Sequence, residues 1–307
     1  MSILVTGGAG FIGSQLLRSL NKFGERLVVA DKISYAGKKS NLPENIEFYK
    51  IDIASDDAVR YLFEQETFDT VFHLAAESHV DNSIKNPKPF IDTNVIGTVN
   101  LLQASLEHEV DRFMHISTDE VFGSIDFKDG SFNEESRYQP RNPYSASKAA
   151  SDHFVNAYNI TYGLPTTITN CSNNYGPRQD DEKMIPTIIR NIKNGTPIPV
   201  YGDGQQVRDW IYVEDHCDAL IELWINGKVG ERYNIGGECE LKNIDLVKMI
   251  CKLMSREDHH IEHVTDRPGH DLRYSTSNKK ITTETKWSVS TDITTGLLNT
   301  ILYYEDN

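Results

Sequence analysis

Short apolar runs alternate with longer stretches of helical periodicity through the first 171 residues. The apolar runs occupy residues 3–6, 27–30, 46–51, 70–74, 112–117 and 165–171. Between them, apolar residues recur three or four positions apart at 12–23, 56–66, 93–107 and 145–162. Uninterrupted apolar runs are typical of parallel strands buried on both faces. Strands that alternate with helices predict an α/β fold, a doubly wound parallel sheet with helices on both sides.

The pattern changes after about residue 174, where Pro, Gly and Asn separate shorter elements. No Gly/Ser-rich linker, internal repeat or low-complexity segment interrupts the chain. We therefore expect a sheet domain over 1–174 and a smaller second region over 175–307. Some chain of the second region should cross back to the first domain.

Composition limits the kinds of partner and compartment. The chain has 31 Lys and Arg against 45 Asp and Glu, a formal charge of −14, which argues against nucleic acid or an anionic membrane as a partner. No apolar stretch approaches the roughly 18 residues of a membrane-spanning helix, and no basic, then apolar leader opens the chain. The four cysteines have no CxxC spacing and indicate buried free thiols in a reducing compartment, so we expect the cytoplasm. We also expect no metal, because His259, His260 and His263 lie in a polar, solvated stretch.

A glycine-rich turn lies between the first predicted strand and the first predicted helix. Gly7, Gly10 and Gly13 form the pattern G-x-x-G-x-x-G, which permits a tight turn and close approach of a pyrophosphate. The helix N-terminus then offers N–H groups and partial positive charge to the phosphates. Asp31 ends the second strand, 24 residues after Gly7, where a carboxylate binds an adenosine ribose and repels the extra phosphate of NADP. The sequence therefore predicts a Rossmann-type domain that binds NAD.

A tyrosine and a lysine stand four residues apart at the start of a predicted helix. Tyr144 and Lys148 therefore share one helix face. A tyrosine beside an ammonium group and a positively charged nicotinamide should have a lowered pKa and could take a proton from a hydroxyl of the substrate. This pair is the predicted site of proton abstraction.

Three polar residues follow the strand at 112–117, where ligands bind in such sheets. Thr118 could donate a hydrogen bond to a reacting oxygen, and Asp119 and Glu120 could serve as an acid and a base. A reductase or an epimerase does not need two carboxylates here. A dehydratase does, because one proton must leave carbon and another must reach a departing hydroxyl.

Together these motifs resemble a known family. The glycine loop with the Tyr144–Lys148 pair resembles the extended, nucleotide-sugar-modifying branch of the short-chain dehydrogenase/reductases. Within that branch the chain is similar to the dTDP-glucose 4,6-dehydratases, in the motifs DKISYAG (31–37), AAESHVD (75–81), TDE (118–120), YSASK (144–148), NCSNNYGP (170–177), RDW (208–210) and DRPGHD (266–271). It departs from the usual pattern at Phe122, where Tyr is usual, at Asn82, where Arg is usual, and in a shorter stretch over 124–138.

The resemblance implies a three-step reaction on a nucleoside-diphosphate glucose, dTDP-glucose above all. Tyr144 takes the proton of the 4-hydroxyl as hydride leaves C4, while Lys148 holds the nicotinamide ribose and Thr118 polarises the C4 oxygen. Glu120 then removes the C5 hydrogen, and Asp119 protonates the departing 6-hydroxyl. Hydride finally returns to C6, which gives a 4-keto-6-deoxy sugar nucleotide and regenerates NAD.

The remaining candidate residues surround this chemistry. The cofactor set is Gly7, Gly10, Phe11, Ile12, Gly13, Asp31, Lys32, Ser34, Asp52, Ile53, Leu74, Ala75, Ala76, Thr93, Tyr144, Lys148 and Asn174. The substrate set is Ser78, Thr118, Asn173, Lys183, Tyr201, Arg208, Asn243, Arg267 and His270. Its arginines suit bidentate binding of phosphate in an otherwise acidic protein.

Two other functions and one assembly are consistent with parts of the sequence. A sugar-nucleotide epimerase or decarboxylase would use Tyr144 and Lys148 but would not need Asp119 and Glu120. A catalytically silent NAD-binding regulator would keep the glycines but could discard Tyr144, Lys148 or Glu120, all of which are present. The helices at 93–107 and 145–162 could pair across a two-fold axis, so we expect a homodimer.

Overall fold

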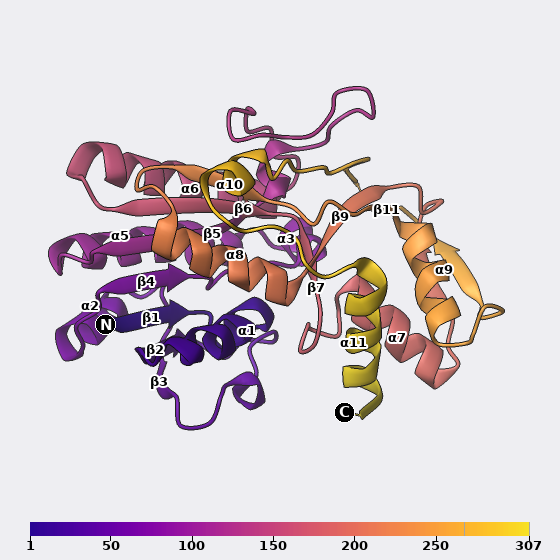
Figure 1. Ribbon diagram of the computed structural model, residues 1–307, viewed down its shortest axis with the longest axis horizontal. Helices are drawn as coiled ribbons and strands as arrows, with labels where there is room; N and C mark the ends of the chain where they lie inside the picture. The colour runs from indigo at the N-terminus through magenta and orange to yellow at the C-terminus, as the bar shows by residue number, and fades with distance from the viewer. Residues whose placement is uncertain (267, 307) are drawn as a thin grey trace.

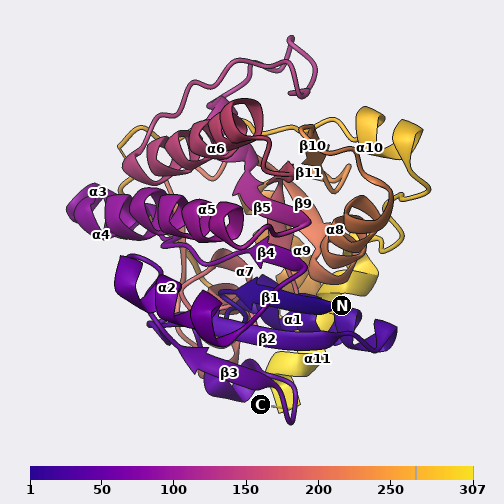
Figure 2. The same cartoon turned by 90° about the vertical axis from the view of Figure 1, so that its left-hand side faces the viewer.

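A seven-stranded parallel sheet forms the centre of the computed structural model, which describes residues 1–266 and 268–306 (Figures 1 and 2). The strand order is β10-β6-β5-β4-β1-β2-β3, and all neighbouring pairs are parallel. The strands are β1 (Ser2–Thr6), β2 (Arg26–Asp31), β3 (Glu47–Lys50), β4 (Thr70–His73), β5 (Arg112–Thr118), β6 (Thr166–Cys171) and β10 (Arg232–Ile235). This arrangement confirms the predicted doubly wound α/β fold.

Helices cover both faces of this sheet because alternate strand residues point in opposite directions. In β1, Ile3 and Val5 pack in the same core as the apolar side chains of α1 and α8. Leu4 belongs to the core on the other face, with residues of α2, α5 and α6. The covering helices are α1 (Phe11–Leu20) and α8 (Val213–Asn226) on one face, and α2 (Asp56–Gln65), α5 (Gly97–Glu107) and α6 (Pro143–Tyr162) on the other.

Local sequence signals set the ends of α6, the helix that carries the Tyr144–Lys148 pair. The Asn142 side chain accepts a hydrogen bond from the Ser145 amide, Ser145 bonds back to Asn142, and Pro143 occupies the first turn. Such reciprocal capping and an early proline are typical of a helix start. Gly163 ends the helix in the left-handed conformation, with φ 74°. Tyr144 therefore lies at the first turn of a well-defined helix.

The chain after β6 builds a second, smaller layer beyond one end of the sheet (Figure 1). It contains the sheet β11-β9-β7 and the pair β12-β8. Its elements are β7 (Asn173–Tyr175), α7 (Met184–Asn194), β8 (Ile198–Tyr201), β9 (Val207–Tyr212), β11 (Glu240–Lys242), α9 (Asn243–Leu253), β12 (Ile261–Val264) and α11 (Ile293–Asp306). The chain returns to the seven-stranded sheet at α8 and β10, and again at α10 (Lys279–Glu284), which packs against β10. We therefore propose a boundary near residue 174 with these two return crossings.

The predicted helix over 93–107 has a different beginning in the structure. Residues Ile91–Ile96 form a π-helical turn that runs into α5, after the short helices α3 (Val80–Lys85) and α4 (Lys88–Phe90). π-Turns inside helices occur often at functional sites. Here the turn presents Thr93 and Asn94 towards the interior, and the Asn94 amide bonds both Glu77 O and Ser147 Oγ. Apolar periodicity does not reveal such a turn, because the same residues also fit a regular helix.

Three further sequence expectations concern the cysteines, membrane-spanning helices and metal sites. All four cysteines are free, with Cys171, Cys217 and Cys251 buried and Cys239 half-buried. Among the described residues, no helix combines the length and the apolar character required to cross a membrane. No group of three His, Cys, Asp or Glu side chains in this part of the chain is arranged to hold a metal ion.

Candidate active site

A cavity of about 290 Å³ opens at the carboxyl ends of the central strands. Residues after β1 and after β4 line it, which places it at the point where the strand order reverses. Every residue of the predicted cofactor set contributes to its wall. So do Ser78, Thr118, Asp119, Glu120 and Lys183. The structure thus brings the predicted cofactor and reaction residues into one space.

The glycine turn has no room for side chains at its two ends. Gly7 has φ +71°, and a Cβ there would lie 2.7 Å from the Ala75 nitrogen. A Cβ on Gly13 would lie 2.3 Å from the Gly7 carbonyl oxygen. Bare backbone and the N-terminus of α1 therefore face the cavity, an arrangement that fits the pyrophosphate of a dinucleotide.

Asp31 ends β2 beside this turn with its carboxylate already held in place. Its Oδ1 accepts a hydrogen bond from Ile33 N at 2.7 Å, and its Oδ2 accepts one from Ala9 N at 3.0 Å. Burial raises the pKa of Asp31, while these two amides and Lys32 oppose the rise. The carboxylate is therefore rigid, lines the cavity and has one remaining lone-pair direction on each oxygen for a ribose hydroxyl.

The protein should prefer NAD⁺ over NADP⁺, because the 2′-phosphate of NADP⁺ would meet the fixed Asp31 carboxylate. We expect Asp31→Asn to narrow this preference by about tenfold, equivalent to about 1.4 kcal/mol. Titration calorimetry on protein stripped of nucleotide measures both affinities, with the exposed Asp56→Asn as the control. Equal or tighter binding of NADP⁺ to the unaltered protein would contradict the role of Asp31.

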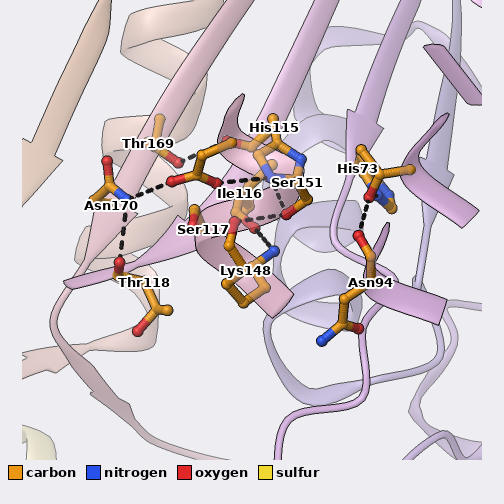
Figure 3. A network of polar contacts seen from close by, with 12 residues as sticks. His73, Asn94, His115, Ile116, Ser117, Thr118, Lys148, Ser151, Thr169 and Asn170 are labelled. Atoms are coloured by element: carbon orange, nitrogen blue, oxygen red, sulfur yellow. Dashed lines mark hydrogen bonds and ion pairs between the residues drawn. The ribbon is translucent and has the colours of Figure 1, made fainter. Parts of the chain in front are cut away.

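Tyr144 and Lys148 line the same cavity from the first two turns of α6. Both side chains are buried, and Lys148 Nζ donates a hydrogen bond to the Ile116 carbonyl at 2.8 Å (Figure 3). Burial raises the pKa of Tyr144 well above its ordinary value, and the charge of Glu120 raises it further. The protein's own groups raise this pKa because the cavity wall removes the water that would solvate a phenolate and places two carboxylates nearby. The lowering expected beside a positively charged nicotinamide stays a prediction.

The two carboxyl groups after β5 lie in different electrostatic environments. Asp119 is 2% exposed, and burial together with the charges of Glu120 and Asp209 raises its pKa well above the ordinary value. Burial also raises the pKa of Glu120, but Arg208 and Lys183 oppose the rise. Two neighbouring carboxylates add to the rise in the pKa of Asp119, whereas two cations oppose the rise in the pKa of Glu120. Two carboxyl groups that differ in this way can divide proton donation and proton abstraction between them.

A second cavity of about 90 Å³ adjoins the first and shares Glu120 and Asn173 with it. Arg208 and His270, both in the predicted substrate set, also line it. The Arg208 guanidinium lies 4.2 Å from the ring centre of Tyr274 and donates hydrogen bonds to the carbonyls of Val207 and Asp271. A stacked, bonded guanidinium is held ready for a planar anionic group such as phosphate.

Two described members of the predicted substrate set line neither of these cavities. The Tyr201 hydroxyl lies 3.3 Å from the Asp81 carboxylate, and Tyr201 lines neither cavity. Asn243 begins α9, and its amide bonds Gln206 O, also away from both. Arg267 lies outside the described residues. Their roles in substrate binding stay predictions.

Several cavity residues were missed by the sequence reasoning. Asn142, Asp271 and Tyr274 line the smaller cavity, while Cys171 and Gln179 line the larger one. Asn142 stands two residues before Tyr144 and Asp271 lies in the DRPGHD motif, so a signal existed for both. Gln179 carries no such signal, because only the turn after β7 brings it to the cavity.

Comparison with known proteins extends the resemblance to the whole chain. The sequence profile described as GDP-mannose 4,6 dehydratase matches residues 4–300. A dTDP-glucose 4,6-dehydratase of Haemophilus influenzae is 46% identical, over 99% of this chain and 98% of the relative.

Solved structures agree with the sequence comparison. The dTDP-glucose 4,6-dehydratase of Streptomyces venezuelae, solved with NAD and the ligand TYD, has a TM-score of 0.96 at 41% identity and covers 100% of this chain and 98% of its own. A UDP-glucose 4-epimerase of Thermus thermophilus, solved with NAD, has a TM-score of 0.95, covering 99% of both chains, but only 27% identity. The fold is thus shared with epimerases, whereas sequence identity over the full length is higher to the dTDP-glucose 4,6-dehydratases, at 41–46%, than to this epimerase, at 27%. The chain belongs to the dTDP-glucose 4,6-dehydratase family of the extended short-chain dehydrogenase/reductases.

Proposed function

We propose that the protein is an NAD-dependent hydro-lyase that converts dTDP-glucose into dTDP-4-keto-6-deoxyglucose and water. One observation supports this most strongly. Tyr144, Lys148 and the pair Asp119–Glu120 line one cavity, and the two carboxyl groups have different electrostatic surroundings. Full-length relatives at 46% identity bear the name dTDP-glucose 4,6-dehydratase.

The first half of the reaction is oxidation at C4. NAD, held by the glycine turn, Asp31 and Lys148, supplies the hydride acceptor and later the hydride donor. Tyr144 removes the proton of the 4-hydroxyl, and the Thr118 hydroxyl donates a hydrogen bond to the same oxygen. Tyr144 takes this proton as a phenolate and becomes a phenol, and Lys148 stabilises the phenolate form because it places a positive charge on the same face of α6.

The second half is elimination of water across C5 and C6. The new ketone makes the C5 hydrogen acidic, and Glu120 removes it. Asp119 gives its proton to the departing 6-hydroxyl, which leaves as water with its bonding electron pair. The raised pKa of Asp119 keeps it protonated for this step, whereas Arg208 and Lys183 favour the ionised form of Glu120. Reprotonation of C5 and reduction at C6 complete the product.

A product assay tests this proposal. The purified protein is incubated separately with dTDP-, UDP- and GDP-glucose, and the masses of the sugar nucleotides are measured by mass spectrometry. Loss of one water from dTDP-glucose, with the appearance of a 4-keto group, supports the proposal. A product of unchanged mass with altered stereochemistry would show an epimerase, and bound NAD without any product would show a regulator.

We further propose that two copies pair through α5 and α6, and that the dimer works in the cytoplasm. These helices lie side by side on one face of the sheet (Figure 2). They and the preceding π-turn expose Ile91, Ile96, Phe154 and Ile160, with Ile160 at 74%. Contiguous exposed apolar side chains often mark an interface, and four free cysteines fit a reducing compartment.

Phe154→Glu should convert the dimer into monomers, because the new carboxylate would be buried without a partner between the paired helices. Sedimentation equilibrium measures the mass. Ile225→Glu is the control, since Ile225 is 54% exposed on α8, on the opposite face of the sheet. A dimer that persists in Phe154→Glu would contradict pairing through this face.

A further inference from the structure

A third polar residue continues the row formed by Tyr144 and Lys148 along α6. Asp152 follows Lys148 by four residues, so it lies on the same helix face, and its side chain is 0% exposed. Asp152 lines neither cavity, so it does not contact a ligand there. A fully buried carboxylate is costly unless it is bonded and balanced by a positive charge.

The Asp152 carboxylate connects three separate parts of the fold. Its Oδ1 lies 3.1 Å from His115 Nε2 on β5. Its Oδ2 accepts hydrogen bonds from the Tyr138 hydroxyl at 2.5 Å and from Asn170 Nδ2 on β6 at 3.2 Å. The Asn170 amide also donates to the Thr118 carbonyl at 3.1 Å, and Figure 3 shows Asn170 between Thr118 and this network. The helix that carries Tyr144 is thereby tied to the strand end that carries Thr118.

The charge balance of this network involves Lys148. Burial and the Lys148 charge lower the pKa of His115 to about 4, against the opposing effect of Asp152, so His115 is neutral at neutral pH. Burial opposes ionisation of Asp152, but His115, Lys148 and the Tyr138 hydroxyl together bring its pKa below the ordinary value. In return, the Asp152 charge raises the pKa of Lys148 against the lowering by burial.

The other titratable groups packed around Lys148 carry no charge at neutral pH. Burial lowers the pKa of His73 on β4 well below its ordinary value, which leaves it neutral. Burial raises the pKa of Cys171 on β6 to about 12, so it stays a thiol. Burial likewise raises the pKa of Tyr138 and of Tyr144, so the protein's own groups favour the phenol form of both. Among these described neighbours, Asp152 is therefore the counter-charge of Lys148.

We propose that Asp152 is a positioning residue of the active site, which keeps Lys148 charged and fixes α6 to the Thr118 end of β5. It acts through Lys148 and Asn170 and does not touch the substrate. This inference rests on the proposed function, because Lys148 is the group that stabilises the Tyr144 phenolate.

The pH profile of Asp152→Asn tests the proposal. Removing the carboxylate charge lowers the pKa of Lys148. As the pH is raised, Lys148 therefore loses its proton, and the enzyme its activity, at a lower pH than in the unaltered protein. We expect the alkaline limb of turnover to move down by about one unit, the lower end of what a neighbouring opposite charge does. The acid limb of the pH profile should not move, because Lys148 is protonated at those pH values in both proteins. Asp152→Glu, which restores the charge, should return the alkaline limb towards that of the unaltered protein.

A second readout does not depend on turnover. The ε-carbon resonance of Lys148 in isotope-labelled protein, identified by its loss in Lys148→Arg, reports the titration of the amine directly. It should titrate at lower pH in Asp152→Asn than in the unaltered protein. Asp152→Ser removes the same charge and leaves room for a water, and it serves in the same two experiments if Asp152→Asn does not fold.

Asp215→Asn is the matched control. Asp215 is likewise buried on a helix, α8, with 2% of its surface exposed, and it binds Ser290 and Thr291 away from both cavities. Its loss should lower the melting temperature and leave both limbs of the pH profile unchanged. An unshifted alkaline limb and an unshifted lysine resonance in the neutral Asp152 variants would overturn the proposal. An unaltered protein that dehydrates no sugar nucleotide would instead overturn the proposed function.

Discussion

Replacing Glu120 with Gln should leave oxidation at C4 intact and stop the reaction before water is lost. Tyr144, Lys148 and the cofactor turn are unchanged in this variant, whereas the proposed base for C5 is gone. Elimination should slow by about 10²–10⁴-fold, the usual contribution of a positioned general base. A single turnover should then show near-ultraviolet absorbance of NADH, little 6-deoxy product and slow exchange of the C5 hydrogen with heavy water.

Two neighbouring variants serve as controls for this assignment. Asp119→Asn loses the acid but keeps the base, so exchange at C5 should persist while water loss is slow. Tyr144→Phe should give neither NADH nor exchange, because the C4 oxygen keeps its proton. Release of product by Glu120→Gln at the native rate, or failure to form any NADH, would show that Glu120 and Asp119 do not divide the elimination as proposed.

Arg208→Ala should have two separable effects. Loss of a buried cation that faces the substrate phosphate should weaken substrate binding at a cost of about 2–5 kcal/mol, as when one partner of a buried charge pair is removed. Arg208 also lowers the pKa of Glu120 against the rise caused by burial. Without Arg208 the pKa of Glu120 rises. As the pH is lowered, Glu120 therefore becomes protonated, and stops acting as a base, at a higher pH than in the unaltered protein. The acid limb of turnover should therefore move to higher pH.

Arg273→Ala is the matched control for this prediction. Arg273 is 7% exposed, as Arg208 is, but it pairs with Glu240 and lines neither cavity. Its loss should reduce stability without moving the acid limb. Substrate affinity is measured by calorimetry with dTDP, and NAD affinity in parallel. A fall in NAD affinity equal to the fall in dTDP affinity would show that Arg208 supports the fold and does not grip the substrate.

Local pattern explains why most of the fold and the cofactor site could be predicted. Apolar runs identify buried strands, and a glycine turn after the first strand restricts where a dinucleotide can lie. Most of the 17 predicted cofactor residues lie in the glycine turn or near strand ends, whereas Thr93, Tyr144 and Lys148 lie on helices, and all 17 line the large cavity. Chain order alone places these groups at the same edge of the sheet. The π-turn over Ile91–Ile96 was missed because its residues also satisfy helical spacing.

Properties that depend on distant residues were not predictable in the same way. Burial and Glu120, 24 positions earlier, raise the pKa of Tyr144, and the Tyr–Lys pair alone gives no sign of either effect. The partners of Asp152 come from β5, β6 and the segment before α6, and no motif unites them. Tyr201 and Asn243 were selected by resemblance, and neither lines a described cavity.

Transfer of the C4 hydrogen to C6 within one sugar molecule is the most direct test of the proposed dehydration. dTDP-glucose carrying deuterium at C4 is incubated with the protein and its bound NAD, and the product is examined by mass and by proton resonance. We expect the product to have lost one water, to keep the deuterium at C6 and to carry one solvent hydrogen at C5. Loss of the label to solvent, or its return to C4 without loss of water, would contradict it.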